Sequence, residues 1–180
     1  MGAKMLKSNN PLIPNQASEC INNFLKSTPI IKNKSLTILL VEDNILDAEL
    51  TREAIESIDI KSHIIETTDG VDALICFEDL NDKALQLPDV ILLDLGLPHL
   101  DGFKVLAKIN HDKKLKNIPI IILTGTSNNS YIQHYYKDLK VIDYIVKPCT
   151  PENLSVAFTK MPESISEQDP HTQSFMGFKI

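Results

Sequence analysis

The sequence predicts an α/β fold built on a parallel β-sheet. Short runs of aliphatic and β-branched residues recur along the chain, and segments with the helical spacing of apolar residues separate them. This alternation is typical of parallel strands joined by right-handed helical crossovers. Several apolar runs also end on an acidic, hydroxyl or amino side chain. Functional groups should therefore gather at the carboxyl edge of the sheet, where such folds bind ligands.

Strands and helices are expected in strict alternation. Short apolar runs between polar residues indicate strands that are buried on both faces. Helices are indicated where apolar residues recur in helical steps, and in the first helix these are Leu46, Leu50, Ala54 and Ile58. We expect strands at 37–41, 62–67, 90–93, 118–123 and 141–146. We expect helices at 45–57, from 70 to the polar stretch that begins at 79, at 103–110, at 129–137 and at 151–160.

Two prolines agree with these limits. Pro119 falls among the first residues of the strand 118–123, where the missing N–H of a proline is tolerated better than in mid-strand. Pro151 falls in the first turn of the last helix, where an N–H would have no partner within the helix.

Five strands in this scheme fit a doubly wound parallel sheet of the flavodoxin-like order 2-1-3-4-5. The strands 37–41 and 90–93 are then neighbours at the point where the winding reverses. We expect one folded domain at 35–161, preceded by a flexible, polar and basic leader at 1–34 and followed by a tail at 162–180. With 43% hydrophobic residues, the chain has enough apolar side chains for a core.

Charge and cysteine content exclude several classes of function. A net charge of -6 argues against a nucleic-acid binder, which normally presents a basic face. No apolar run approaches the length of a transmembrane helix, so no membrane partner is expected. The three cysteines are an odd number without metal-type spacing, which argues against a disulfide framework or a zinc site and fits a reducing, cytoplasmic location.

The ends of the predicted strands carry a chemically coherent set of side chains: Glu42, Asp43, Asp94, Thr124 and Lys147. Three carboxylates in one crevice resist ionisation unless a cation compensates their charge. Mg²⁺ binds to one or two carboxylates and keeps sites for water and phosphate oxygens, and a lysine is a good partner for phosphate. A carboxylate can itself be the nucleophile that forms an aspartyl phosphate. The set predicts a carboxylate that is phosphorylated with the help of Mg²⁺.

Each of these residues alone would have an ordinary explanation. An acid or an asparagine after a strand is usually a loop residue or a helix N-cap, a threonine at a strand end is common, and a Lys-Pro pair is a typical turn. Their coincidence at one edge of the sheet is what favours a functional site.

Four motifs resemble the receiver domain of bacterial two-component response regulators, of the single-domain, chemotaxis-regulator-like kind. Leu-Val-Glu-Asp-Asn at 40–44 is similar to the acidic pocket of this family. Leu-Leu-Asp-Leu-Gly-Leu-Pro at 92–98 resembles the phosphoacceptor loop. Leu-Thr-Gly at 123–125 and Tyr-Ile-Val-Lys-Pro at 144–148 resemble the two switch segments. The polar stretch before residue 88 resembles that of regulators that serve phytochrome kinases.

The resemblance implies a role for each site residue. Asp94 would be the phosphoacceptor, and Lys147 would bridge the acidic pocket and the phosphoryl group. Mg²⁺ would be bound directly by Asp43 and Asp94, through water by Glu42, and by the backbone carbonyl of Gly96.

The resemblance also implies a conformational switch that responds to phosphorylation. Thr124 would turn toward the phosphoryl group and assist catalysis, and Tyr144 would rotate inward behind it. The Lys147-Pro148 peptide bond would be cis.

As a function, the resemblance implies a stand-alone response regulator rather than an enzyme with its own substrate, catalysing only its own phosphorylation and dephosphorylation. A sensor histidine kinase or a phosphotransfer protein would supply the phosphoryl group. The output would pass to a downstream protein, or to a second copy of the chain in a homodimer, through the face formed by 129–137, 141–146 and 151–160.

Other functions remain open at this stage. A degenerate receiver would act as a constitutive protein-interaction module without phosphorylation. A flavin-binding flavodoxin would need a phosphate loop where Glu42 and Asp43 stand, and a phosphatase of the haloacid-dehalogenase type would need an acid where Gly96 stands. No Gly-x-x-x-x-Gly-Lys loop for a nucleoside triphosphate is present.

Overall fold

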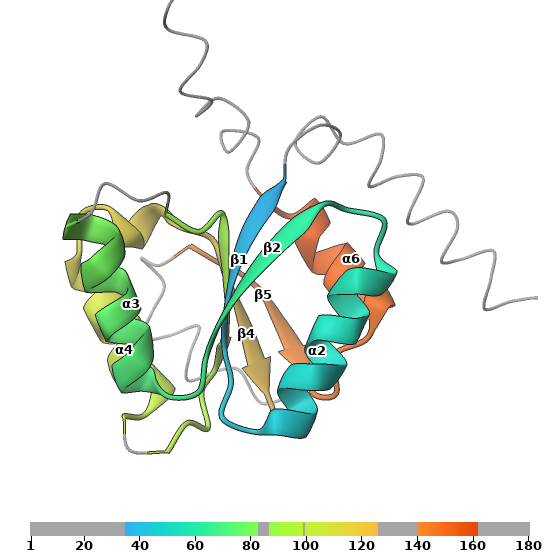
Figure 1. Cartoon of the computed structure of the whole chain (residues 1–180), viewed down its shortest axis with the longest axis horizontal. Helices are drawn as coiled ribbons and strands as arrows, with labels where there is room; N and C mark the ends of the chain where they lie inside the picture. Colours follow the sequence, from blue (N-terminus) through green and yellow to red (C-terminus); the bar gives the residue numbers. More distant parts are fainter. Residues whose placement is uncertain (1–34, 83–86, 99, 126–139, 162–180) are drawn as a thin grey trace, which may run out of the picture.

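Five parallel strands form one sheet in the order β2-β1-β3-β4-β5, as predicted, and helices cover both of its faces (Figure 1). The computed structural model describes residues 35–82, 87–98, 100–125 and 140–161. The strands are β1 Leu36–Val41, β2 Ser62–Thr67, β3 Val90–Asp94, β4 Ile120–Thr124 and β5 Val141–Val146. The helices are α2 Ile45–Ser57, α3 Gly70–Asp82, α4 Gly102–His111 and α6 Pro151–Thr159, with a 3-10 helix, η1, at Leu115–Asn117.

The sheet separates two hydrophobic clusters, one beneath each layer of helices. One cluster packs α2 and α6 against the sheet, and the other packs α3 and α4 against the opposite face (Figure 1). Every residue of β3 and β4 is buried, whereas β2 and β5 at the two edges are mostly half-buried. Central strands of a parallel sheet are covered on both faces, which explains their uninterrupted apolar sequences.

The face that α2 buries differs from the predicted one. Leu46 and Leu50 are 69% and 43% exposed, although Ala54 and the C-cap residue Ile58 are buried as expected. The buried residues within the helix are Ala48, Thr51, Ala54 and Ile55. Ala48 and Thr51 are small or polar, so a search for large apolar residues overlooks this face.

Pro119 was also placed wrongly, because β4 begins one residue later, at Ile120. Proline has no N–H to give to a neighbouring strand, so it precedes the ladder, although its carbonyl still accepts a 3.0 Å hydrogen bond from the N–H of Ile91. Pro151 lies in the first turn of α6, as predicted.

Helix α3 is longer than predicted, and one short helix was not predicted. Helix α3 continues to Asp82 rather than stopping before 79, so the first residues of the predicted polar stretch belong to the helix. The 3-10 helix η1 was not predicted. The helix expected at 129–137 lies outside the described residues.

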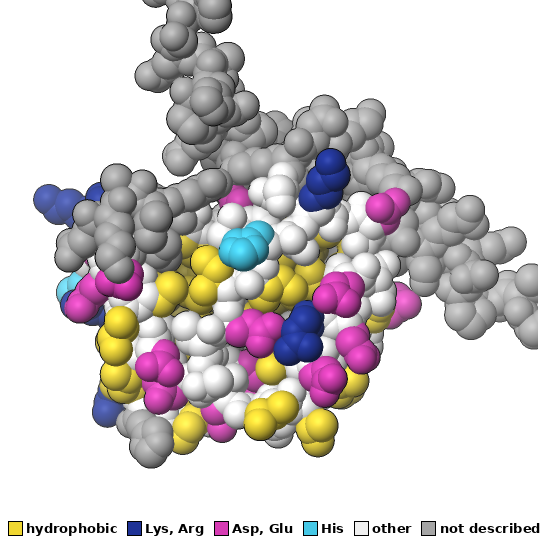
Figure 2. Space-filling model, viewed as in Figure 1, with side chains coloured by type: hydrophobic (Ala, Val, Ile, Leu, Met, Phe, Trp, Pro, Cys, Tyr) yellow, Lys and Arg dark blue, Asp and Glu magenta, His cyan; other side chains and the backbone are white. Residues whose placement is uncertain are grey.

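The surface agrees with the overall composition. On the face drawn in Figure 2, acidic side chains are more widespread than basic ones, in keeping with the net charge of -6. Among the residues that the structure describes, no helix has the length and apolar character needed to cross a membrane.

Gly102 lets α4 begin directly beside the end of β3. A Cβ atom at this position would lie 2.4 Å from the backbone oxygen of Asp94 and 2.7 Å from the Cα atom of Leu95. Both neighbours are backbone atoms, so neither can turn away as a side chain could. The absence of a side chain at 102 therefore permits the close approach of α4 to the backbone of Asp94 and Leu95.

We expect Gly102→Ala to lower the free energy of unfolding. Alanine improves helix propensity by at most about 1 kcal/mol, whereas overpacking against backbone costs about 1–3 kcal/mol or more, so the clash dominates. Urea denaturation measures the difference. Gly125→Ala is the matched control, because a Cβ atom there meets none of the described residues within 4 Å. Equal stability of Gly102→Ala and the unmodified protein would contradict this explanation.

Candidate functional site

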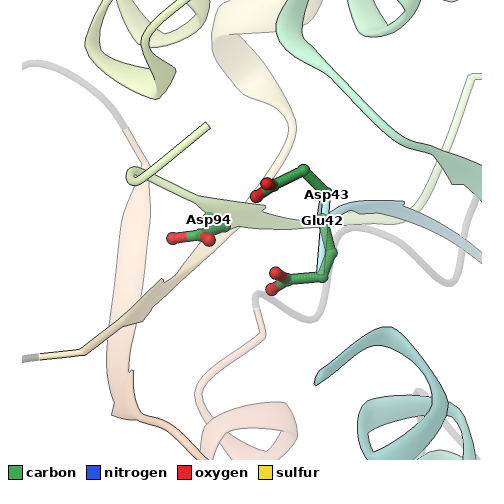
Figure 3. A group of neighbouring side chains, drawn as sticks. All are labelled: Glu42, Asp43 and Asp94. Atoms are coloured by element: carbon green, nitrogen blue, oxygen red, sulfur yellow. The ribbon is translucent and has the colours of Figure 1, made fainter. Parts of the chain in front are cut away.

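Two neighbouring strands end in the acidic cluster that the sequence predicted. Glu42 and Asp43 follow β1, Asp94 ends β3, and one carboxylate oxygen from each lies within 4.8 Å of the others (Figure 3). Glu42 and Asp94 are buried, and Asp43 is exposed. The parallel pairing of β1 with β3 brings these acids together although the sequence separates them widely.

Lys147, directly after β5, places its ammonium group among the acids. Its Nζ atom lies 2.8 Å from Oε1 of Glu42, 2.7 Å from Oδ2 of Asp94 and 3.2 Å from Oδ2 of Asp47. The sequence prediction missed Asp47. It sits in the first turn of α2, where an acid is an ordinary helix-stabilising residue, so no signal set it apart.

A side-chain cap holds the start of α2 beside this site. Oδ1 of Asn44 accepts hydrogen bonds from the N–H groups of Leu46 and Asp47, at 3.0 Å and 3.3 Å. Asn44 in turn donates its own N–H to Oε1 of Glu42 at 3.2 Å. The cap therefore ties the first turn of α2 to the acidic end of β1.

The pKa values in this cluster reflect competition between burial and charge. Burial raises the pKa of Glu42 to about 7, helped by the neighbouring Asp94 and opposed by the hydrogen bond from Lys147. Burial lowers the pKa of Lys147, but its hydrogen bonds to Asp94 and Glu42 outweigh this effect and raise the pKa overall. The lysine is therefore fully charged, whereas Glu42 is held in the site at an electrostatic cost.

The remaining predicted residues lie on the same edge or just behind it. Thr124 is buried at the end of β4, and its carbonyl oxygen accepts a 2.9 Å hydrogen bond from the N–H of Lys147. Tyr144 lies on β5 opposite Ile122 of β4, is half-buried against the hydrophobic cluster of α3 and α4, and has a pKa raised by burial. Its register places it two residues before the strand end.

The loop that follows β3 and the loop that follows β5 each have one further notable feature. The N–H of Gly96 donates to Oδ1 of Asp94 at 2.8 Å, so both carboxylate oxygens of Asp94 have partners. The Lys147-Pro148 peptide bond is cis, as predicted.

The carboxylate oxygens of Glu42, Asp43 and Asp94 suit a hard divalent cation as ligands. Carboxylate oxygens are the ligands that Mg²⁺ prefers in proteins, and three of them converge here. Oε2 of Glu42 is buried and lies 2.6 Å from Nζ of Lys147, yet no hydrogen-bond donor is aligned with it. Asp43 is the exposed member of this group, and it adds a third carboxylate to the two buried ones.

We expect Lys147→Met to lower the free energy of unfolding in the presence of EDTA. Removal of one partner from a buried ion pair typically costs about 3–5 kcal/mol, and we expect about 2–4 kcal/mol here because the lysine side chain is 15% exposed. Chemical denaturation measures the loss.

Lys160→Met is the matched control for this variant. Lys160 forms an ion pair of the same 2.7 Å length with Asp143, but its side chain is 46% exposed. Exposed pairs contribute about 0–1 kcal/mol, so the control should lose less than about 1 kcal/mol. Equal losses in both variants would show that the acidic cluster does not depend on the charge of Lys147.

Comparison with known proteins agrees with this geometry. The family described as "Response regulator receiver domain" matches residues 38–159. The response regulator Rcp1 of Synechocystis sp. is 35% identical over 116 residues, which cover 64% of this chain and 78% of Rcp1.

Solved structures show the same relationship. The structure of the phosphorylated cyanobacterial phytochrome response regulator RcpA is 36% identical, with a TM-score of 0.57 and coverage of 68% of this chain and 88% of that one. The Mn²⁺-bound form of Rcp1 is 30% identical, with a TM-score of 0.57 and coverage of 74% and 96%. With the receiver family matched over most of the sheet and its helices, the chain belongs to the response regulator receiver domains of two-component systems.

Proposed function

We propose that this protein is a stand-alone response regulator that accepts a phosphoryl group on Asp94 and signals through an altered surface. The proposal rests on the environment of Asp94. This residue ends a buried strand beside two further acids, and its Oδ2 atom accepts a 2.7 Å hydrogen bond from Nζ of Lys147. The phosphorylated state named for RcpA, a relative of 36% identity, supports the same reading.

The donor would be a phosphohistidine of a sensor histidine kinase or of a phosphotransfer protein. A carboxylate oxygen of Asp94 attacks the phosphorus, a P–O bond forms and the P–N bond breaks. The imidazole nitrogen keeps the electron pair of the broken bond and takes up a proton. Lys147 donates hydrogen bonds to the phosphoryl oxygens, as charge-assisted donors to phosphate do.

Mg²⁺ is the proposed cofactor, held by Asp43 and Asp94, through water by Glu42, and by the backbone carbonyl of Gly96. A bound divalent ion supplies charge stabilisation for the phosphoryl oxygens during transfer. The convergence of three carboxylates within 4.8 Å supports this assignment. So does the Mn²⁺ ion named for the structure of Rcp1.

Thr124 and Tyr144 are the proposed switch residues. Both lie on the β4 and β5 side of the sheet, and β5 is an edge strand that is mostly half-buried. A phosphoryl group on Asp94 adds charge and strong acceptors beside Thr124, and it shifts the population toward the state that binds these acceptors. The surface of β5 and α6, together with 129–137, would then engage a downstream protein or a second copy of the chain.

The proposed function also sets the limits of the receiver domain and the location of the protein in the cell. The receiver domain would span 35–161, with 1–34 and 162–180 outside it, in the cytoplasm and without nucleic-acid or membrane partners. The alternative is a degenerate receiver that serves as a constitutive interaction module. A phosphoacceptor is favoured over a degenerate receiver because one edge carries the full set of Glu42, Asp43, Asp94, Thr124 and Lys147.

Incubation with Mg²⁺ and acetyl phosphate should add the mass of one phosphoryl group to the intact protein. The product should be stable in acid and labile in base, as an acyl phosphate is, and EDTA should prevent its formation. Asp94→Asn should gain no mass, whereas Asp72→Asn, which alters an exposed acid in the first turn of α3, should behave like the unmodified protein. Mass gain by Asp94→Asn would overturn the assignment of the phosphoacceptor.

The switch is testable by hydrogen exchange with beryllofluoride and Mg²⁺, which mimic the phosphoryl group. We expect amide protection to change in β5, Val141–Val146, because this edge strand carries Tyr144 and leads to Lys147. The opposite edge strand β2, Ser62–Thr67, is the internal control and should stay unchanged. An equal change at both edges, or none at β5, would argue against a switch on this side of the sheet.

A further inference from the structure

We propose that Asp47 is a positioning residue that holds the ammonium group of Lys147 against Asp94 for phosphoryl transfer. The inference rests on the proposed function of Asp94 as phosphoacceptor. It concerns a residue on α2, outside the strand-end motifs that predicted the site, and it assigns to this residue a role in the reaction.

The geometry of the lysine carries the inference. An ammonium group has three N–H donors, and Lys147 has three carboxylate partners on three different elements. Glu42 approaches from the end of β1 and Asp94 from the end of β3, whereas Asp47 approaches from the first turn of α2, at 3.2 Å. Each donor therefore has an acceptor, and the three acceptors together define the position of Nζ.

Asp47 differs from the other two acids in its surroundings. Its side chain is 29% exposed, against 0% for Glu42 and 9% for Asp94. It also lies outside the group of three acids whose oxygens converge within 4.8 Å. Asp47 is thus placed to hold the lysine without being a ligand of the divalent ion.

Asp47 matters for the proposed phosphorylation because its contact with Lys147 is unaffected when Asp94 is modified. When Asp94 becomes an acyl phosphate, the carboxylate that Lys147 contacts at 2.7 Å loses its charge, and the lysine must turn to the phosphoryl oxygens. Glu42 and Asp47 are unchanged by this step and keep two donors of the ammonium group engaged. Small misplacements of a catalytic group slow a reaction considerably, so loss of one anchor should slow the transfer.

An acid in the first turn also stabilises a helix by interacting with its dipole, and this simpler role must be separated from positioning. Loss of helix stabilisation alone would change the stability of the protein but not the reactivity of the amine of Lys147. The accessibility of this amine is therefore the discriminating measurement, and it requires neither metal nor phosphoryl donor.

Asp47→Asn keeps the shape of the side chain and removes its charge. Glu49→Gln is the matched control, because it removes one charge from an exposed position on the same helix. Each protein is treated in EDTA with a limiting amount of an amine-acylating reagent, and peptide mass spectrometry compares Lys147 with the exposed Lys104. We expect labelling of Lys147 to rise about two- to fivefold in Asp47→Asn, as the loss of one partly exposed ion pair implies, and to stay unchanged in Glu49→Gln.

The rate of phosphorylation by acetyl phosphate and Mg²⁺ completes the test. We expect a decrease of about two- to fivefold in Asp47→Asn and none in the control. Unchanged labelling of Lys147, or increased labelling with an unchanged rate, would overturn the positioning role. If the unmodified protein takes up no phosphoryl group, the proposed function fails. The labelling result then decides separately whether Asp47 holds the lysine.

Discussion

The structure depends on one ammonium group that compensates several carboxylates at the edge of a parallel sheet. Glu42 and Asp94 are buried, and their charges would repel each other without Lys147 between them. The lysine does not neutralise the site, because Asp43 and Asp47 add further negative charge. The excess negative charge makes this edge favourable for a cation. The hydrophobic clusters on both faces of the sheet hold in place the strands that carry these acids.

The topology explains how such a site can be assembled from distant residues. Lys147 contacts an acid 105 residues away in the sequence and another 53 residues away. All five strands run in the same direction, so the residue after each strand reaches the same edge without any special loop. The site is therefore a consequence of strand order, and the side chains that act there need only follow the strands.

The sequence was informative wherever periodicity and strand ends determine structure. The strand order, the acids after β1 and β3, and the lysine after β5 all follow from apolar runs and the residues that end them. The buried face of α2 was predicted wrongly, because Ala48 and Thr51 pack where large residues were sought. Asp47 was missed because it lies in the first turn of α2 rather than at a strand end, where an acid is an ordinary helix-stabilising residue.

The position of Lys147 provides a route by which the proposed phosphorylation of Asp94 would act on the edge of the sheet. The acids stand at the ends of β1 and β3, which pair with strands on both sides, whereas the lysine follows β5, which pairs only with β4. We therefore expect a change of charge at Asp94 to act on β5, which has a neighbouring strand on one side only. Because the N–H of Lys147 is bonded to the carbonyl of Thr124, movement of the lysine also acts on the end of β4. The same residue that stabilises the acidic cluster thus links it to the edge strand through which the signal would leave.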